Sequence, residues 1–382
     1  MCSSDLQILR IGLQAGLAVD ELDLERNTPL LSTFIGWDFS HGAAAQLLLQ
    51  ARADPLVHSE RDFSAVVGAL RTLNVDLLIS LFKHGGKCNL KDHENRELSI
   101  NSLEQEKALA FGFLCSQNEF YCRRICGSDS AARMKAVVDL ILQDNTLSTF
   151  RSMELIEGDT TPLIISCHRR RSDLLKAVLS SASCPDVDEA DSDGMTALLW
   201  CAERGNLDGA IQLLHSGANL LPFSNKGFNI FHNAARFAPD FLIRILDAIE
   251  AGEVPCPQGL DARALLAIPT RDKDETTSFV LAVMEGTPEH LNCAEALRTR
   301  YSLDYDAYEI PALNIFRHMG DEGKMTLMAY LTATSVMTNM ITLSQVEYVL
   351  SLNPKPRFRA DTSGKTLLHF AVCGFYHGKY RH

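Results

Sequence analysis

The sequence predicts an all-α chain built from a pair of short helices that recurs along its length. Turn residues, helix-capping side chains and apolar faces return in the same order at similar spacing. The composition, 46% hydrophobic and 22% charged over 382 residues, is that of an ordinary globular protein with enough sequence to bury a core. Two short helices cannot bury their apolar faces alone, so neighbouring pairs must stack on one another.

The clearest copy of the repeat begins at Asp193 and reads DGMTALLWCAERGNLDGAIQLLHSGANL. Gly194 supplies the positive φ of a tight turn, and Thr196 is placed to cap the first helix with its hydroxyl. Gly205 can end that helix in the left-handed conformation, and Gly217 can end the second one. We therefore expect the order turn, helix, turn, helix within this unit.

Other copies align on the capping position. Thr161 lies 35 residues before Thr196, and Asn229 lies 33 residues after it. The full set of equivalent positions is Thr28, Ser64, Thr161, Thr196, Asn229, Thr277, Ile310 and Thr366. The segment LQAGLAVD from Leu13 to Asp20 also reads as the tail of a preceding unit, so we expect about nine units.

This pattern resembles the ankyrin repeat, most clearly in the units at Asp193 and at Asp361 (DTSGKTLLHFAV). The resemblance implies an ankyrin-type helical repeat solenoid with short turns and hairpin fingers. His232 and His369 stand at the position of the family's histidine, which implies that they tie adjacent turns by hydrogen bonds rather than act in catalysis.

The spacing divides the chain into five expected segments. Residues 1–92 are divergent repeats, and 93–159 form one enlarged repeat with helices near Ala108–Cys115 and Met134–Leu142. Residues 160–251 are the best-formed repeats, followed by an irregular insertion over 252–275 and divergent repeats over 276–382. A further irregular stretch is expected around Thr342–Ala360, and the last unit is expected to be incomplete.

Charge and cysteine content restrict the possible partners and compartments. Lys and Arg number 36 and Asp and Glu 48, so the net charge of −12 argues against nucleic acid and anionic membranes as partners. The 11 cysteines are scattered, and no secretory signal follows Met1, so we expect a cytoplasmic or nuclear protein that is not secreted. Met325–Val346 is uncharged but rich in hydroxyls, which favours buried helices over a membrane span.

No motif of the chain predicts an active site. Gly364–Thr366 lacks the earlier glycine of a phosphate loop, because position 359 is Arg. His168–Arg171 lacks the aspartate of a kinase catalytic loop. Three cysteines lie near one another without a zinc-ligand spacing: Cys115, Cys122 and Cys126. We therefore expect no enzyme activity, no cofactor, no metal and no small-molecule substrate.

Three functional hypotheses remain at this point. The first is a non-enzymatic scaffold that binds a protein partner on the concave face of the solenoid. The alternative is the regulatory ankyrin portion of a larger enzyme or signalling protein whose catalytic domain lies outside this chain. The third is an enzyme that uses residues 93–159 as an active-site insertion, although nothing in that segment has a catalytic pattern.

The resemblance also implies a binding face. In ankyrin arrays the eighth, eleventh and twelfth positions of each unit, with the capping residue counted as fourth, usually point outward on the concave side. An arginine recurs there beside aromatic side chains, a composition enriched at interfaces. The residues expected to bind a partner are Ile165, Arg169, Trp200, Glu203, Arg204, Arg236, Phe237 and Arg317. The partner expected is an acidic, partly apolar protein segment; the alternative is a buried Trp200 beside merely solvated arginines.

Overall fold

A computed structural model describes the chain as a series of helix pairs. The described residues are 3–34, 42–57, 64–87, 103–117, 129–143, 160–257, 260–272, 275–303, 309–311, 324–326 and 343–352. They form two compact units, Met1–Ser192 and Asp193–His382. Apart from one short strand pair, the regular secondary structure of these residues is helical, which confirms the all-α repeat fold.

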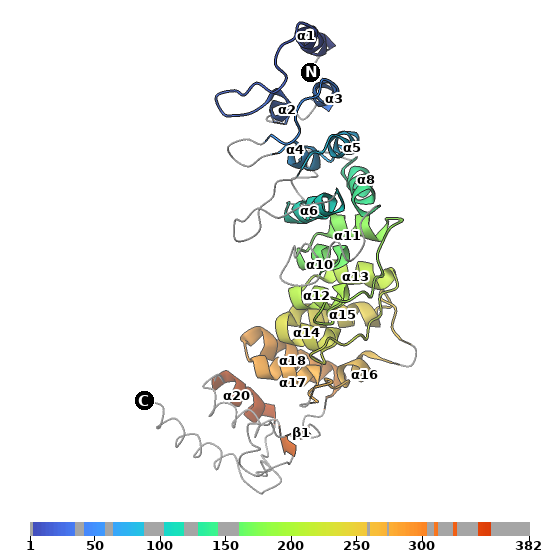
Figure 1. Ribbon diagram of the computed structural model, residues 1–382. Coiled ribbons are helices and arrows are strands. Elements are labelled where there is room, and N and C mark those ends of the chain that lie inside the picture. The colour runs from blue at the N-terminus through green and yellow to red at the C-terminus, as the bar shows by residue number, and fades with distance from the viewer. Residues whose placement is uncertain are drawn as a thin grey trace. The chain divides into compact units, whose positions relative to one another are not determined.

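Unit 1 consists of two rows of helices. The first helices of its pairs are α2 (Pro29–Ser32), α4 (Ala65–Arg71), α6 (Leu103–Ser116) and α10 (Pro162–His168). The second helices are α1 (Ser3–Gln14), α3 (Gly42–Gln50), α5 (Val75–Lys83), α8 (Ser130–Leu142) and α11 (Ser172–Leu179). Within each row every helix packs on the next, and across the rows the partners of a pair pack together (Figure 1). The core therefore runs between the two rows.

The same arrangement recurs in unit 2. Its first helices are α12 (Ala197–Arg204), α14 (Ile230–Phe237) and α17 (Ser278–Glu285). Its second helices are α13 (Leu207–His215), α15 (Pro239–Glu250) and α18 (Pro288–Tyr301). The row α12, α14, α17 packs in sequence, and so does the row α13, α15, α18 (Figure 1). A short extra helix, α16 (Ala262–Leu266), packs on α15 within the expected insertion.

The capping residues expected from the sequence begin the first helices. The Thr196 hydroxyl accepts a hydrogen bond from the Leu199 amide at 3.3 Å, which satisfies one of the free donors of the first turn. Three further first helices begin in the same way, at Thr28, Ser64 and Thr161. Thr277 stands at the same position of α17 without a capping hydrogen bond.

The turns before the first helices of unit 2 are joined by backbone hydrogen bonds. Gly194 has φ +71°, and the Asp193 carbonyl next to it accepts from the Asn225 amide at 2.9 Å. One repeat later, the Gly227 carbonyl accepts from the Arg271 amide at the same distance. A β-carbon on Gly194 would meet the Asn225 nitrogen at 2.8 Å, so the close approach requires glycine. These contacts are the expected finger contacts.

The enlarged segment keeps the helix pair of an ordinary repeat. The two helices expected there are present as α6 and α8, which pack on each other. α6 also packs on α4 and α10, and α8 packs on α5 and α11, so both rows continue through this segment. The additional residues of the segment, 93–102, 118–128 and 144–159, lie outside the described part of the chain.

Side-chain hydrogen bonds between residues far apart in the sequence connect α18 to the preceding helix pair. The His290 Nε2 donates to the Arg236 carbonyl at the end of α14, 54 residues earlier, at 2.9 Å. The Tyr301 hydroxyl donates to Glu250 of α15, 51 residues earlier, at 2.7 Å. A second helix thus bonds both helices of the pair before it.

Helix α20 (Leu343–Leu352) repeats these connections one step further. Gln345 donates from Nε2 to the Met284 carbonyl at the end of α17 at 2.8 Å, and the Tyr348 hydroxyl donates to Glu295 of α18, 53 residues earlier, at 3.1 Å. α20 therefore takes the second-helix place of the next pair. The sequence interpretation assigned this stretch to an irregular segment and did not predict the helix.

The C-terminal part of the chain also contains the strand pair. β1 (Glu309–Pro311) pairs antiparallel with β2 (Lys324–Thr326), and Ile310 lies opposite Met325. Ile310 and Pro311 were expected to begin a helix, and they lie in β1 instead. The helix residues expected after them, and the unit at Asp361–Val372, lie outside the described residues.

Candidate protein-binding surface

The ends of the first helices of unit 2 carry the predicted binding residues. On α12, Trp200 is half-buried, and the Arg204 guanidinium lies 5.4 Å from the centre of its ring. The two side chains are one helical turn apart, a spacing that brings them onto one face. An arginine stacked on an indole covers apolar area while its charge stays near solvent. Trp200 is therefore neither fully buried nor fully exposed.

α14 carries the second part of the surface at its C-terminal end. Phe237 is 48% exposed, an unusual state for a large apolar side chain. The Arg236 guanidinium lies 5.2 Å from the centre of the Phe237 ring and 5.8 Å from that of Phe228. Because α12 and α14 are neighbours in one row, Arg204 and Phe237 occupy equivalent positions on adjacent helices.

An acidic side chain from the next helix completes this surface. Glu285, the last residue of α17, accepts a hydrogen bond from Arg236 Nε at 2.9 Å. Both side chains are largely exposed, at 42% and 37%, so this ion pair contributes little to stability. The surface therefore carries an acidic side chain beside its arginines. We refer to Trp200, Arg204, Arg236, Phe237 and Glu285 as the stripe of unit 2.

The remaining predicted site residues have different environments. Ile165 is 1% exposed in α10, so the outward orientation expected of it is not observed. The equivalent Asn233 and Leu281 are also buried, at 2% and 7%. Trp200 occupies the same position of its repeat. It is the one of these four residues that reaches solvent, because its indole is larger than the space that a shorter side chain fills. Arg169 is exposed in unit 1, Glu203 is half-buried, and Arg317 lies outside the described residues.

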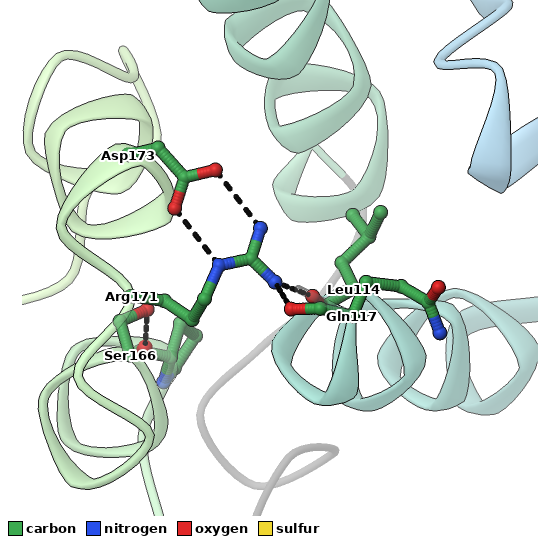
Figure 2. A network of polar contacts seen from close by, with 6 residues as sticks. Leu114, Gln117, Ser166, Arg171 and Asp173 are labelled. Atoms are coloured by element: carbon green, nitrogen blue, oxygen red, sulfur yellow. Dashed lines mark hydrogen bonds and ion pairs between the residues drawn. The ribbon is translucent and has the colours of Figure 1, made fainter. Parts of the chain in front are cut away.

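The sequence analysis did not identify Arg171, a buried arginine two positions after the exposed Arg169. Arg171 is 4% exposed and pairs with Asp173 through Nε and Nη2, both at 2.9 Å (Figure 2). Its Nη1 donates to the carbonyls of Leu114 and Gln117 at the end of α6. A cation at a helix C-terminus satisfies free carbonyls and complements the helix dipole. Arg171 thus joins α11 to α6 within unit 1.

His232 performs the structural role that the resemblance implied. Its Nδ1 accepts from the Asn229 amide at 3.1 Å, and its Nε2 donates to the Ile268 carbonyl in the next turn at 2.9 Å. The ring is fully buried, and this burial lowers the pKa of His232 from 6.5 to about 4. The neutral form supplies one donor and one acceptor, which is what the two bonds require. The equivalent His369 lies outside the described residues.

Potential metal ligands and cysteines are the remaining chemistry-bearing side chains of the described ranges. No group of three or more His, Cys, Asp or Glu side chains in the described ranges could hold a metal ion. Cys115 is buried, and burial raises the pKa of its thiol, which keeps it protonated and unreactive. Its expected neighbours Cys122 and Cys126 lie outside the described residues. Among the helices that the structure describes, none has the length and apolar character needed to cross a membrane.

Together, the rows of helix pairs, the finger contacts and the tying histidine define a helical repeat protein. Residues 130–224 match the family model for ankyrin repeats (3 copies). This segment of the chain therefore contains ankyrin repeats. Ankyrin repeats generally bind other proteins.

Comparison with individual proteins gives distant relatives. The "Ankyrin repeat and KH domain-containing protein mask-1" of Caenorhabditis elegans is 19% identical over 253 residues, which cover 65% of this chain and 9% of that protein. The ankyrin repeat domain of Bcl-3, a member of the IkappaB family, is 18% identical with a TM-score of 0.38; the match covers 62% of this chain and 91% of that one. A chain of the structure of the predatory endopeptidase Bd0816 from Bdellovibrio bacteriovorus in complex with the immunity protein Bd3460 is 18% identical with a TM-score of 0.39; the match covers 57% of this chain and 94% of that one.

Proposed function

We propose that this chain is a non-enzymatic scaffold that binds a protein partner through the stripe of unit 2. The observation that carries the proposal is the pairing of an arginine with an aromatic ring that reaches solvent on each of two adjacent helices, Arg204 with the half-buried Trp200 and Arg236 with the exposed Phe237. Tryptophan and arginine dominate binding energy at protein interfaces because they combine contact area with directional hydrogen bonds. A single exposed ring needs no explanation, whereas two ordered pairs in one row favour an interface.

The chemistry of the stripe favours an acidic, partly apolar partner segment. The rings offer apolar contact, and the arginines offer charge-assisted donors. The chain as a whole carries a net charge of −12, so a fully acidic partner would be repelled except where such arginines face it. A segment that alternates apolar and acidic side chains fits this surface best.

The proposal is tested by a double substitution of the stripe. Trp200→Ala combined with Arg204→Glu should weaken the native complex, identified by crosslinking and mass spectrometry, by at least about 2 kcal/mol. A matched control is Arg263→Glu on α16, which changes the same charge at an exposed position away from the stripe. Circular dichroism should show both variants folded. Unchanged affinity in the double variant would place the binding site elsewhere, such as at the fingers.

A regulatory role inside a larger protein is the second candidate. It is favoured by the relative from Caenorhabditis elegans, which is described as carrying ankyrin repeats together with a KH domain and of which the match covers 9%. Sequencing of the full-length transcript distinguishes the two proposals, because only the second requires a further domain in the same chain.

A further inference from the structure

We propose that Arg236 is the anchor of the stripe and that it binds a side-chain carboxylate of the partner, an Asp or Glu next to an apolar residue that packs on Phe237. In the free protein Glu285 pairs with Arg236, and it therefore competes with the partner carboxylate for the guanidinium. This inference rests on the proposed function, and it names the residue that selects the partner and the chemical group that is selected.

The Arg236 guanidinium is held in place from several sides. The rings of Phe228 and Phe237 flank it, and Glu285 accepts from its Nε. The backbone at this residue is also fixed, because the Arg236 carbonyl accepts from His290 of α18. An arginine that is already ordered loses less conformational entropy when it binds, which raises its affinity for a ligand.

The ordered guanidinium keeps its outer edge available. Only Nε forms a hydrogen bond, and the Nη1 and Nη2 groups donate to no residue in the part of the chain that the structure describes. These two groups form the planar fork that matches both oxygens of a carboxylate. Arg204 differs here, because it has further interactions beyond its stacking on Trp200. Arg236 is therefore the better anchor for an acidic side chain.

Glu285 already shows that a carboxylate can pair with Arg236. It contributes one oxygen to one donor, and both side chains are exposed, so water competes with this pair. A partner carboxylate that covers Phe237 would exclude water and engage the fork with two oxygens, which strengthens the interaction. The two carboxylates then share one guanidinium, so each weakens the interaction of the other with Arg236.

The nearby charges favour a carboxylate over a phosphate group. Glu285 stays close to the bound anion, and the chain carries a net charge of −12. A phosphorylated side chain brings about two negative charges, and a carboxylate brings one, so repulsion discriminates against the phosphate. The occupant is therefore an unmodified acidic peptide segment.

A random 12-residue peptide library displayed on phage tests this inference on the full chain. Peptides enriched on the wild type should share an acidic residue adjacent to an aliphatic or aromatic one. Synthetic copies should bind Arg236→Gln at least tenfold more weakly and the Arg263→Gln control with unchanged affinity. Replacement of the acidic residue by Gln or by phosphoserine should each lower the affinity for the wild type by a similar factor. Thermal melts establish that each variant is folded.

The competitor is tested separately. Glu285→Gln removes the internal carboxylate and should raise the affinity of the same peptides about threefold, whereas Glu289→Gln on α18 should change it little. Peptides that lose binding on Trp200→Ala or Phe237→Ala but bind Arg236→Gln normally would overturn the carboxylate anchor and leave the proposed function standing. Tighter binding of the phosphoserine peptides would overturn the choice of a carboxylate. Enrichment of no peptide, or of peptides insensitive to all stripe substitutions, would count against both proposals.

Discussion

Arg171 in unit 1 and Arg236 in unit 2 each link neighbouring repeats, and they do so in opposite environments. Arg171 is 4% exposed, and its guanidinium joins Asp173 to two carbonyls at the end of α6, those of Leu114 and Gln117 (Figure 2). Arg236 is 42% exposed, and it has one ion-pair partner and two flanking rings. The guanidinium of Arg171 uses its donors within the fold, whereas that of Arg236 keeps donors that a ligand can use.

The difference shows how burial changes the role of one residue type. A buried guanidinium must have its donors satisfied, because an unpaired buried charge is strongly unfavourable. An exposed guanidinium can exchange partners, because water screens the pair that it forms. The stability of the chain should therefore depend on Arg171 and its binding on Arg236.

The largest effect is expected from Arg171→Ala. The substitution leaves Asp173, whose side chain is 16% exposed, without its ion-pair partner and removes the donor to the end of α6. Breaking a buried pair from one side costs about 3–5 kcal/mol in the free energy of unfolding. Urea denaturation monitored by hydrogen exchange should show this loss in unit 1. The neighbouring exposed Arg169→Ala should cost little, and equal effects of the two would contradict the comparison.

A smaller effect is expected from protonation of His232, which lies buried in unit 2. Its pKa is about 4 in the folded state and 6.5 in the unfolded state, so the unfolded chain binds the proton first as the pH falls. The free energy of unfolding should therefore fall by up to about 3 kcal/mol as the pH is lowered from 6.5 to 4. Urea midpoints at pH 7 and pH 5 measure the loss. His232→Gln should remove this part of the pH dependence, and a variant with the wild-type pH profile would disprove the assignment.

Substitutions at two glycines with positive φ distinguish the energetic cost of backbone strain from that of a clash between turns. Gly194→Ala should cost about 1–3 kcal/mol, because its new β-carbon would meet Asn225 in addition to straining the turn. Gly217→Ala should cost about 1 kcal/mol, since it has φ +93° but no atom within 4 Å of the new carbon. Thermal unfolding of both variants measures the difference. Equal losses would mean that the finger contact at Asn225 contributes nothing.

The smallest effect on stability is expected from Arg236→Gln. The exposed pair with Glu285 should contribute no more than about 0.5 kcal/mol. Chemical denaturation of this variant should therefore nearly match the wild type, while its binding of acidic peptides falls. A loss of stability comparable to that of Arg171→Ala would show that both arginines are structural and would remove the distinction drawn between them.

Much of the fold could be predicted from short stretches of sequence. Thr196 and Gly205 act within their own turn, so their types indicate a helix start and a helix end without knowledge of the rest of the chain. The same local reasoning failed at Ile310, which lies in β1, and at α20, which the sequence assigned to an irregular stretch. Gln345 identifies α20 as a second helix through a bond to a residue 61 positions away, and no local pattern reports such a bond.

The candidate site shows the same limit. Residue types and repeat spacing singled out Trp200, Arg204, Arg236 and Phe237, and the structure places them on adjacent first helices. Spacing could not reveal that Ile165 is buried or that Glu285 already pairs with Arg236. Exposure and pairing depend on what the neighbouring repeats place against a side chain.

By itself, the sequence determined the repeat, the helix caps and the turns that require glycine, because these depend on interactions within about one helical turn. Only the tertiary structure decided which arginine of the run His168–Arg171 is buried and which arginine on the first helices keeps open donors. The physical reason is that desolvation and hydrogen-bond satisfaction are properties of the surroundings of a side chain. Segments 50 or more residues away in the sequence create those surroundings here.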